Sequence, residues 1–342
     1  MLARACVVGL GTMGSHHLRV LRNIPRVRVV AAVDPSERRR ELARERYPEL
    51  DVLPSLDAVL QSHELDFACL AAPVEELPEL AARCIDASIH VLVEKPMAPS
   101  EGEATAMVQA AHKAGVLLSV GYVERYNPAV VALRQRLEEG AIGRVLQFHA
   151  RRLSPPPARA GMTSVALDLA THDIDVMRYL AGSEVTRVYA ETAQRFQVDN
   201  DDLLCATLRF ESDATGLLEV NWITPTKVRQ LYVTGDEGMF VVDYLLQDLM
   251  FFENPRMATE WGALQGVRGT GEGDMIRFAL ARREPLAVEW ESFLAALAGE
   301  KALLVSGEDG VTALRIAQAI QDSGRLHEVV STMPGRRSNI AV

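Results

Sequence analysis

The stretch Gly9-Leu10-Gly11-Thr12-Met13-Gly14 decides the fold of the first part of this chain. It follows an apolar run, Ala5–Gly9, that is typical of a buried β-strand, and it opens a helical stretch from Ser15. In that context the first glycine permits a tight turn, and the second lets backbone N–H groups approach a pyrophosphate. The third lets the helix pack closely on the strand, while the N-terminus of the helix attracts anions. The stretch therefore predicts a dinucleotide-binding loop.

Strands and helices alternate regularly around this loop. Over the first 120 residues, apolar runs alternate with amphipathic stretches, a pattern typical of parallel strands that are covered on both faces. The expected strands are Ala5–Gly9, Val27–Val33, Phe67–Ala71, His90–Val93 and Val116–Val120, and the expected helices include Ser36–Tyr47, Glu75–Ala87 and Ser100–Ala114. The sequence predicts an α/β fold class with a doubly wound parallel sheet, a Rossmann domain, over residues 1–121.

The pattern changes after Gly121, where strands begin to follow one another directly. Three consecutive prolines predict a loop at Ser154–Ala160, and a polar tail ends the chain. The expected helices are Asn127–Glu139, Val165–Ala181, Leu286–Ala298 and Gly307–Ser323, and the expected strands are Arg144–Leu153, Val185–Arg195, Leu203–Phe210, Thr215–Trp222, Val228–Thr234, Met239–Asp243 and Leu249–Phe252. Residues 122–342 are therefore predicted to form a C-terminal α+β domain with an open, mostly antiparallel sheet.

The composition excludes several classes of protein. The formal net charge of −10 argues against a protein that neutralises nucleic-acid phosphates or lies on an anionic membrane. No apolar run reaches the roughly 18 residues that a membrane-spanning helix needs. Because the sequence enters a strand-like run at once, no signal peptide is expected. The cysteines Cys6, Cys69, Cys84 and Cys205 form no C-x-x-C pair. Buried free thiols in a reducing cytoplasm are expected, rather than a zinc site or disulfides.

An acidic residue stands where a dinucleotide site requires one. Asp34 ends the second strand, 20 residues after Gly14, so its carboxylate can accept hydrogen bonds from the adenosine ribose. The alternative for Asp34 is a helix cap before Pro35. Repulsion of a 2′-phosphate by Asp34 favours NAD over NADP, and Arg38–Arg40 either soften that preference or form a solvated helix face. The cofactor contacts predicted here are Gly9, Gly11, Thr12, Met13, Gly14, Asp34, Ala72, Pro73, Glu94 and Lys95.

The turn Glu94-Lys95-Pro96 follows the strand that ends at Val93. Ligands of a doubly wound sheet bind outside the carboxyl ends of its strands, so this turn delivers Lys95 to the cofactor edge. An ammonium group there can bind a substrate hydroxyl and favour its alkoxide, as hydride abstraction requires. The competing interpretation of Lys95 is an ordinary surface charge. The Lys95–Pro96 bond is left open between cis and trans.

A second group of chemical residues lies in the run Asp168–Asp175. Asp168 and His172 are four residues apart, so on a helix they share a face, and the carboxylate can orient the imidazole as a general base. The alternative is a purely structural His–Asp contact. Asp173 and Asp175 raise the question of a divalent metal, but the other ligands for one are not evident, so no metal is expected.

These residues resemble the glucose–fructose oxidoreductase/inositol dehydrogenase/MocA family over essentially the whole chain. In that family the lysine of the E-K-P turn and the acid and histidine of the D-x-x-x-H helix form the catalytic triad. The resemblance therefore implies that Lys95, His172 and Asp168 are catalytic. Two stretches, Gly121–Pro128 and Asp168–Leu180, resemble the UDP-N-acetylglucosamine 3-dehydrogenase branch, where G-H-x-E-R-F-N-P and D-L-x-x-H-D-I-D-x-M are typical.

The branch resemblance implies NAD-dependent oxidation of the C3 hydroxyl of a UDP-N-acetylhexosamine, as a step towards a 3-amino sugar of a lipopolysaccharide or lipid A type. The expected substrate contacts are Lys95, Glu124, Arg125, Asn127, Arg152 and His172. Arg125, Arg151 and Arg152 could bind the diphosphate through bidentate contacts, although Arg151 and Arg152 equally suit an exposed strand end. Oxidation of a free polyol such as inositol is the alternative, and a non-catalytic NAD-binding regulator is the second.

An assembly of identical subunits is also expected. A wide antiparallel sheet presents an apolar face, and Tyr232, Val233, Phe240, Val242 and Tyr244 are the candidates for it. The family resemblance favours a homodimer or homotetramer formed through the C-terminal sheet, and the sequence does not choose between the two.

Overall fold

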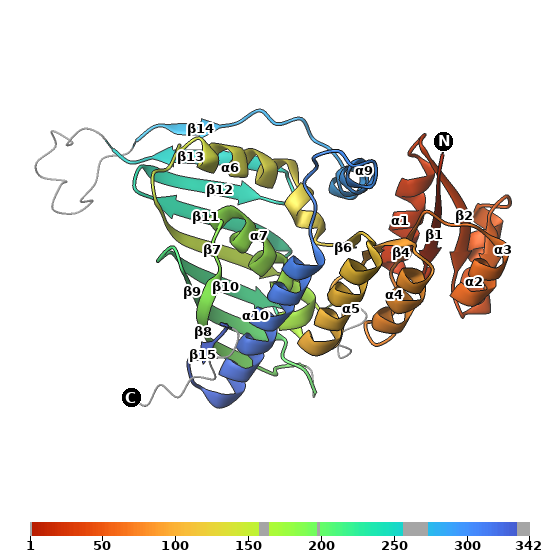
Figure 1. Cartoon of the computed structure of the whole chain (residues 1–342). Helices are drawn as coiled ribbons and strands as arrows, with labels where there is room; N and C mark the ends of the chain where they lie inside the picture. The colour runs from red at the N-terminus through yellow and green to blue at the C-terminus, as the bar shows by residue number, and fades with distance from the viewer. Residues whose placement is uncertain (1, 157–163, 197–198, 256–272, 334–342) are drawn as a thin grey trace, which may run out of the picture. The chain divides into compact units, whose positions relative to one another are not determined.

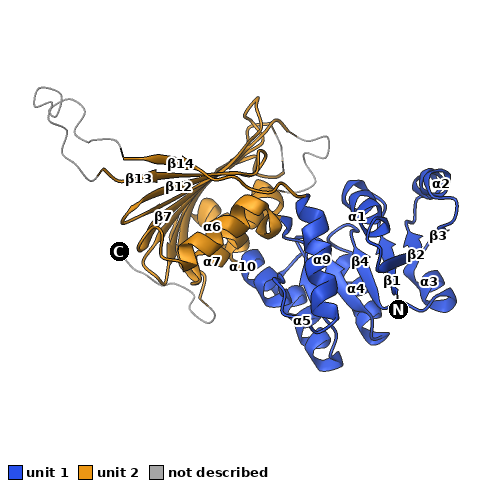
Figure 2. Cartoon of the chain, turned by 90° about the horizontal axis from the view of Figure 1, so that it is seen from above, with its two compact units in different colours: residues 1–123, 284–314 blue, residues 124–283, 315–342 orange. Residues whose placement is uncertain are grey.

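The computed structural model describes residues 2–156, 164–196, 199–255 and 273–333. The chain divides into two compact units, one made of residues 1–123 and 284–314, the other of residues 124–283 and 315–342 (Figure 2). The first segment ends two residues beyond the boundary predicted at 121. Residues 284–314 fold with the first unit, whereas the sequence assigned them to a continuous second domain.

Six parallel strands form the sheet of the first unit, in the order β3-β2-β1-β4-β5-β6 (Figure 1). This is the doubly wound strand order of a Rossmann fold, so the predicted fold class is confirmed. The sequence missed β3 and α3. The elements are β1 Ala3–Val8, α1 Thr12–Arg22, β2 Val27–Val33, α2 Glu37–Arg46, β3 Asp51–Leu53, α3 Leu56–Ser62, β4 Phe67–Leu70, α4 Leu77–Asp86, β5 His90–Val93, α5 Glu101–Ala114 and β6 Leu118–Val120.

Helix α9, Pro285–Leu297, returns to the first unit because its aromatic side chains are buried there. Trp290 and Phe293 are fully buried, and their ring centroids lie 5.5 and 5.4 Å from that of Phe67 on β4. Burying a large aromatic side chain is among the strongest contributions to a core. The Rossmann unit is therefore completed by a helix that lies more than 160 residues beyond β6.

The second unit is built on a nine-stranded sheet in the order β14-β13-β12-β11-β7-β10-β9-β8-β15. Its neighbouring strands are antiparallel except β7 and β10, which run parallel, so the predicted open, mostly antiparallel sheet is confirmed. The strands are β7 Val145–Leu153, β8 Val185–Ala193, β9 Leu203–Phe210, β10 Thr215–Asn221, β11 Val228–Gly235, β12 Gly238–Asp243, β13 Asp248–Glu253, β14 Met275–Arg277 and β15 Val330–Ser331. The remaining elements are the 3₁₀ turn η1 Val123–Tyr126, α6 Pro128–Glu138, the π-turn η2 Ala166–Ala170, α7 Thr171–Ala181 and α10 Gly307–Leu326.

Helices α6 and α7 pack on one face of this sheet, α6 against β12 and β13 and α7 against β7 (Figure 2). Most residues expected on an intersubunit face lie inside the unit instead. Val233, Phe240, Val242 and Tyr244 are at most 5% exposed, and only Tyr232 of the five is partly exposed. Alternate residues of a strand point to opposite faces of the sheet, and the five predicted residues come from both faces. One of these faces packs against the core of its own unit.

The cysteines differ in their exposure. All four cysteines are free, and Cys6, Cys69 and Cys84 are buried, but Cys205 is exposed on β9, contrary to the expectation of buried thiols. The polar tail and residues 157–160 of the predicted proline-rich loop lie outside the described residues. Among the described helices, none combines the length and the hydropathy that a membrane crossing requires.

Candidate active site

The glycine loop between β1 and α1 has the geometry that a pyrophosphate site needs. Gly9 has a φ of +90°, and a Cβ there would lie 2.4 Å from the carbonyl oxygen of Ala71. A Cβ on Gly14 would lie 1.7 Å from the carbonyl oxygen of Gly9, whereas Gly11, the N-cap of α1, has nothing within 4 Å of that position. The first turn of α1, which contains Thr12 and Met13, carries no acidic residue. These residues fit the pyrophosphate of NAD, with open space at Gly11 and the helix N-terminus behind it.

We expect Gly14→Ala to reduce NAD affinity by at least about 30-fold, because the new methyl group cannot fit beside Gly9 without moving the loop. Gly11→Ala is the matched control for protein stability, since its Cβ would meet open space. Without NAD, Gly14→Ala should lower the thermal unfolding temperature, whereas Gly11→Ala should leave it nearly unchanged. Titration calorimetry with NAD gives the affinity. Equal thermal stability of the two variants would contradict the close packing described here.

Asp34 joins the glycine loop to the end of β2. Its Oδ2 accepts a hydrogen bond from the backbone N–H of Leu10 at 2.8 Å, and its Oδ1 accepts one from Ser36 at 2.9 Å. The residue is 1% exposed, and Arg39 also donates to it at 3.4 Å. Arg40 is buried and donates to the Asp34 carbonyl oxygen at 2.7 Å, so it does not belong to a solvated helix face. The contact of Asp34 with the adenosine ribose stays a prediction, and the structure adds a role in holding the loop.

The turn after β5 is fixed by a buried chain of hydrogen bonds within the first unit. Trp290 Nε1–H donates to His17 Nδ1 at 2.9 Å, and His17 Nε2 lies 2.8 Å from Glu94 Oε1. Because the indole group can only donate, Nδ1 must accept, and the proton of the imidazole lies on Nε2 and is donated to Glu94. Glu94 Oε2 in turn accepts the backbone N–H of Lys95 at 3.1 Å. This chain positions the turn that presents the partly exposed Lys95, whose bond to Pro96 is cis.

We expect Trp290→Phe to lower the free energy of unfolding by about 1–3 kcal/mol, because it leaves a buried His17 nitrogen without its donor. In the wild-type protein, ¹⁵N NMR of the labelled imidazole should show a protonated Nε2 and an unprotonated Nδ1, and the Nδ1 signal should shift in Trp290→Phe because it loses its donor. Phe293→Leu is the control, since it reduces packing in the same cluster without touching the hydrogen bonds. A protonated Nδ1 in the wild-type protein would contradict the assigned tautomer.

The predicted catalytic acid and histidine lie at the junction of a π-turn and a helix in the second unit. Asp168 is buried on η2, and His172 stands in the first turn of α7, partly exposed. The sequence predicted a single helix here, but η2 has the wider i→i+5 pattern, which is frequent at functional sites. The segment between Asp168 and His172 is therefore only partly α-helical, so the argument that residues four apart share a helix face does not apply to it in full. Their joint role as an oriented general base stays a prediction.

Two buried arginines connect the stretch 124–127 and strand β7 to this helix. Arg125 binds Asp175 through two hydrogen bonds of 2.7 and 2.6 Å, and Arg152 binds Asp173 through two of 2.7 and 3.0 Å. Arg152 also donates to Glu124 at 3.1 Å. Asp173 and Asp175, which the sequence offered as possible metal ligands, thus bind arginines.

These ion pairs bear on the predicted diphosphate contacts. Burial alone would lower the pKa of Arg152, but the charges of Asp173 and Glu124 outweigh burial, and the pKa is raised. Carboxylates hold the guanidinium groups of Arg125 and Arg152, while Arg151, on the more exposed phase of β7, pairs with Glu219 at 2.8 Å. The contacts of Arg125, Arg151 and Arg152 with a diphosphate stay predictions, which would require the substrate to compete with these carboxylates.

Asn127 is the N-cap of α6. The sequence predicted Asn127 as a substrate contact and did not predict this structural role. Its Oδ1 accepts the backbone N–H of Ala129 at 3.1 Å, and its Nδ2 donates to the carbonyl oxygen of Tyr244 at 3.0 Å. Pro128 occupies the first helical position, where its missing N–H costs nothing. Asn127 is 2% exposed, so its amide primarily joins α6 to the segment after β12.

Sequence reasoning missed one residue of this neighbourhood, Arg229 on β11. It is 8% exposed and shares the buried phase of its strand with Leu231 and Val233. The signal was present in the sequence, because residues at i, i+2 and i+4 of a strand line the same face. An arginine in phase with two core residues predicts a buried cation.

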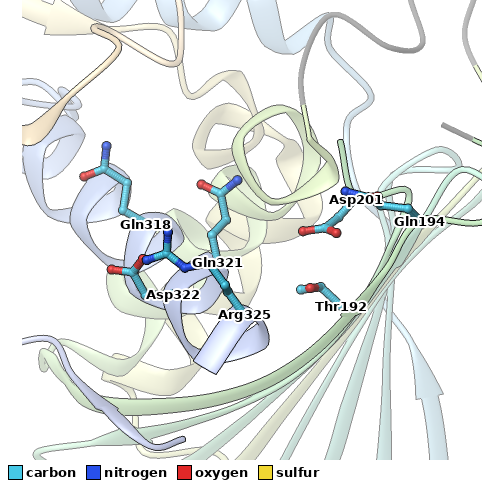
Figure 3. Close-up of a pocket in the computed structure, with 7 residues that line it drawn as sticks. All are labelled: Thr192, Gln194, Asp201, Gln318, Gln321, Asp322 and Arg325. Atoms are coloured by element: carbon cyan, nitrogen blue, oxygen red, sulfur yellow. The ribbon is translucent and has the colours of Figure 1, made fainter. Parts of the chain in front are cut away.

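A polar cavity of about 620 Å³ lies in the second unit, between α10 and the ends of β8 and β9 (Figure 3). The residues that line it are Thr192, Gln194, Asp201, Gln318, Gln321, Asp322 and Arg325. It lies next to the segment that leads into η2, because Gln321 donates to the Ser164 hydroxyl at 2.9 Å and Val165 N–H donates to the Asp201 carbonyl at 3.0 Å. None of the predicted catalytic or cofactor residues lines this cavity.

Comparison with known proteins agrees with this geometry. Residues 3–122 match the family model described as an oxidoreductase family with an NAD-binding Rossmann fold, and residues 130–241 match the GFO/IDH/MocA C-terminal domain. The UDP-N-acetylglucosamine 3-dehydrogenase of Acidithiobacillus ferrooxidans is 26% identical over 93% of this chain and 96% of its own. The myo-inositol 2-dehydrogenase of Thermotoga maritima is 27% identical over 94% of this chain and 96% of its own.

Solved structures give the same assignment. A crystal form of the Acidithiobacillus ferrooxidans UDP-N-acetylglucosamine 3-dehydrogenase superposes with a TM-score of 0.82 at 25% identity, covering 94% of this chain and 97% of that one. The two relatives act on different substrates, so the comparisons resolve the type of reaction and not the substrate. The chain belongs to the GFO/IDH/MocA oxidoreductase family, whose enzymes use NAD to oxidise sugars and polyols.

Proposed function

We propose that this enzyme oxidises the C3 hydroxyl of a UDP-N-acetylhexosamine, UDP-N-acetylglucosamine above all, to a ketone with NAD. The observation that carries the proposal is the pair of buried ion pairs, Arg125 with Asp175 and Arg152 with Asp173. The first pair joins the two stretches that resemble the UDP-N-acetylglucosamine 3-dehydrogenase branch, and Arg152, on β7, bridges Glu124 of one stretch to Asp173 of the other. The similarity to the Acidithiobacillus ferrooxidans enzyme over nearly the full length of both chains supports the same substrate class.

The proposed mechanism assigns one task to each of three residues. Lys95 donates a hydrogen bond to the C3 oxygen and favours its alkoxide, while His172 takes the hydroxyl proton as general base. Asp168 orients His172 and stabilises the imidazolium that forms. The glycine loop would hold NAD, whose nicotinamide would supply the acceptor for the hydride from C3. The carbinol thus loses a proton to the protein and a hydride to the cofactor, and becomes a ketone.

The branch resemblance also suggests where the product goes. A 3-keto sugar is the substrate that an aminotransferase needs to make a 3-amino sugar, which would serve lipopolysaccharide or lipid A-type biosynthesis. We propose in addition that the enzyme works in the cytoplasm, as a homodimer or homotetramer formed through its nine-stranded sheet. Size-exclusion chromatography with light scattering would test the assembly.

Oxidation of a free polyol is the second candidate function. The similarity to the Thermotoga maritima myo-inositol 2-dehydrogenase, at 27% identity and nearly the same coverage, supports this function as well as the Acidithiobacillus ferrooxidans enzyme supports the first. A non-catalytic NAD-binding regulator is disfavoured, because a pure binder has no need for Lys95, His172 and Asp168 together.

NADH formation at 340 nm separates these functions. The purified enzyme is mixed with NAD or NADP and with UDP-N-acetylglucosamine, UDP-N-acetylgalactosamine or myo-inositol, and a coupled aminotransferase removes the ketone. The proposal expects turnover of a UDP-N-acetylhexosamine with NAD, and loss of that turnover in Lys95→Met. Turnover of myo-inositol alone would establish the polyol function instead, and no turnover of any substrate would overturn both.

A further inference from the structure

The side chain of Arg229 has an unusual charge environment within the second unit. It lies on the buried face of β11, and the strand register places it directly opposite Arg152 of β7. Two arginines that face each other repel unless carboxylates neutralise them. Arg152 has two such partners, Asp173 and Glu124. Arg229 forms no ion pair with any carboxylate in the described part of the chain.

Arg229 differs in this respect from the other buried arginines. Five arginines are buried among the described residues, and four of them pair with a carboxylate: Arg40 with Glu37, Arg125 with Asp175, Arg152 with Asp173 and Arg178 with Glu184. Leaving a charge buried without a direct partner is costly. Burial, followed by the charge of Arg152, lowers the pKa of Arg229 to about 10, so it is still protonated at neutral pH.

The hydrogen bonds of Arg229 leave one edge of its guanidinium group open. Its hydrogen bonds within the described part of the chain come from Nη1, which donates to the carbonyl oxygens of Leu153 at 2.7 Å and of Val228 at 2.9 Å. The N–H groups of Nε and Nη2 have no acceptor among the described residues, yet neither nitrogen is sealed from solvent. The Nε–Nη2 edge is the planar fork that binds a carboxylate or a phosphate through two parallel hydrogen bonds.

This open fork lies within range of the charge of Asp168, the residue predicted to orient the general base. The carboxylate of Asp168 is among the charges that act on Arg229, together with those of Asp173 and Glu124. Its anchoring acceptor, Leu153, is the last residue of β7. The triplet of Glu124, Arg152 and Asp173 has one negative charge in excess, which stabilises the Arg229 cation from a distance but does not satisfy its open N–H groups.

We propose that Arg229 binds an oxyanion of the substrate, so that the substrate of this enzyme carries a diphosphate or a sugar carboxylate beside the Asp168–His172 helix. This rests on the proposed function and deepens it, since a nucleotide sugar supplies such an oxyanion and a free inositol does not. It also moves the predicted recognition of the anion from Arg125, Arg151 and Arg152, which carboxylates hold, to Arg229, which forms no ion pair in the described part of the chain.

Binding measurements with non-reacting anions test the inference independently of turnover. The protein is saturated with NAD, which fills the pyrophosphate site at the glycine loop, and is then titrated by calorimetry with UDP or with D-glucuronate. Arg229→Met removes the charge and keeps the stem, and Arg229→Lys keeps the charge but loses the fork. Arg187→Met, at an exposed position of β8, is the matched control.

The expected result is that wild-type protein and Arg187→Met bind one of the two anions equally, and that Arg229→Met binds it about 10- to 100-fold more weakly. Arg229→Lys should fall between them, and it carries the test if Arg229→Met does not fold. Weakened binding of UDP identifies the diphosphate as the source, and weakened binding of D-glucuronate identifies a sugar carboxylate.

Two outcomes would overturn the inference: failure of the wild-type protein to bind either anion at millimolar concentration, or equal binding by folded Arg229 variants. Failure of the proposed function gives a different result. In that case UDP-N-acetylglucosamine is not oxidised, while the dependence of anion binding on Arg229 is still measured. Myo-inositol serves as the uncharged ligand, whose binding should not respond to Arg229.

Discussion

Lys95→Met is expected to lower kcat by roughly 10²- to 10⁴-fold, the range typical of removing a group that handles a proton in the transition state. Lys95 follows β5 at the carboxyl edge of the parallel sheet, where a Rossmann domain binds its ligands. Methionine keeps the length of the side chain and removes its ammonium group. Lys95 is also a predicted cofactor contact, but the pyrophosphate site at the glycine loop does not include it, so the affinity for NAD should fall by less than about tenfold.

The comparison needs a lysine variant that removes a charge from the same unit without touching the turn. Lys113, an exposed residue in the last turn of α5, provides it as Lys113→Met. Initial rates of NADH formation give kcat, and fluorescence titration gives the affinity for NAD. If Lys95→Met lost less than about tenfold in kcat while binding NAD normally, Lys95 would not be the group that activates the hydroxyl.

The parallel sheet of the first unit could be predicted closely, because strands buried on both faces are almost entirely apolar. The predicted strands Val27–Val33 and His90–Val93 agree residue for residue with β2 and β5. Strand β3 escaped prediction because it is a three-residue edge strand, Asp51–Leu53, that starts with an acid and has only Val52 buried. A short edge strand contributes too few apolar residues to form a recognisable run.

The candidate site could be predicted in its chemistry but not in its partners. The sequence places Asp168 and His172 four residues apart, yet it cannot show that η2 closes as a π-turn. It marks Arg125 as a possible anion binder, although its actual partner, Asp175, lies 50 residues away and is reached only by folding. Long-range ion pairs leave no local pattern.

The return of α9 to the first unit was missed for the same reason. Its apolar face suits any core, and its contact with Phe67 is made across more than 200 residues of chain. Arg229 is the exception, since its phase within β11 could have identified it as a buried cation. Only the structure shows that its Nε–Nη2 edge has no acceptor among the described residues.

Asp175→Ala is expected to lower the free energy of unfolding of the second unit by about 3–5 kcal/mol, because it leaves the guanidinium group of Arg125 charged and buried without its partner. Asp175 is fully buried and Arg125 is 4% exposed. Arg125 also lies over the ring of Tyr179, with its Cζ 5.2 Å from the centroid, and so cannot easily reach water. Urea unfolding is followed by circular dichroism, because tryptophan fluorescence would combine the signals of Trp222 in this unit and Trp290 in the first unit.

The double variant Arg125→Met/Asp175→Leu distinguishes the loss of an ion pair from the loss of packing. Replacing both charges by apolar groups removes the unpaired cation, so most of the lost stability should return. Glu138→Ala is the control for an exposed pair, since Glu138 binds Arg134 at 2.6 Å on the surface of α6 and should be worth only about 0.3–0.5 kcal/mol. If the double variant were as unstable as Asp175→Ala, the geometry of the site would depend on the ion pair itself, and the desolvated cation would not be the cause of the instability.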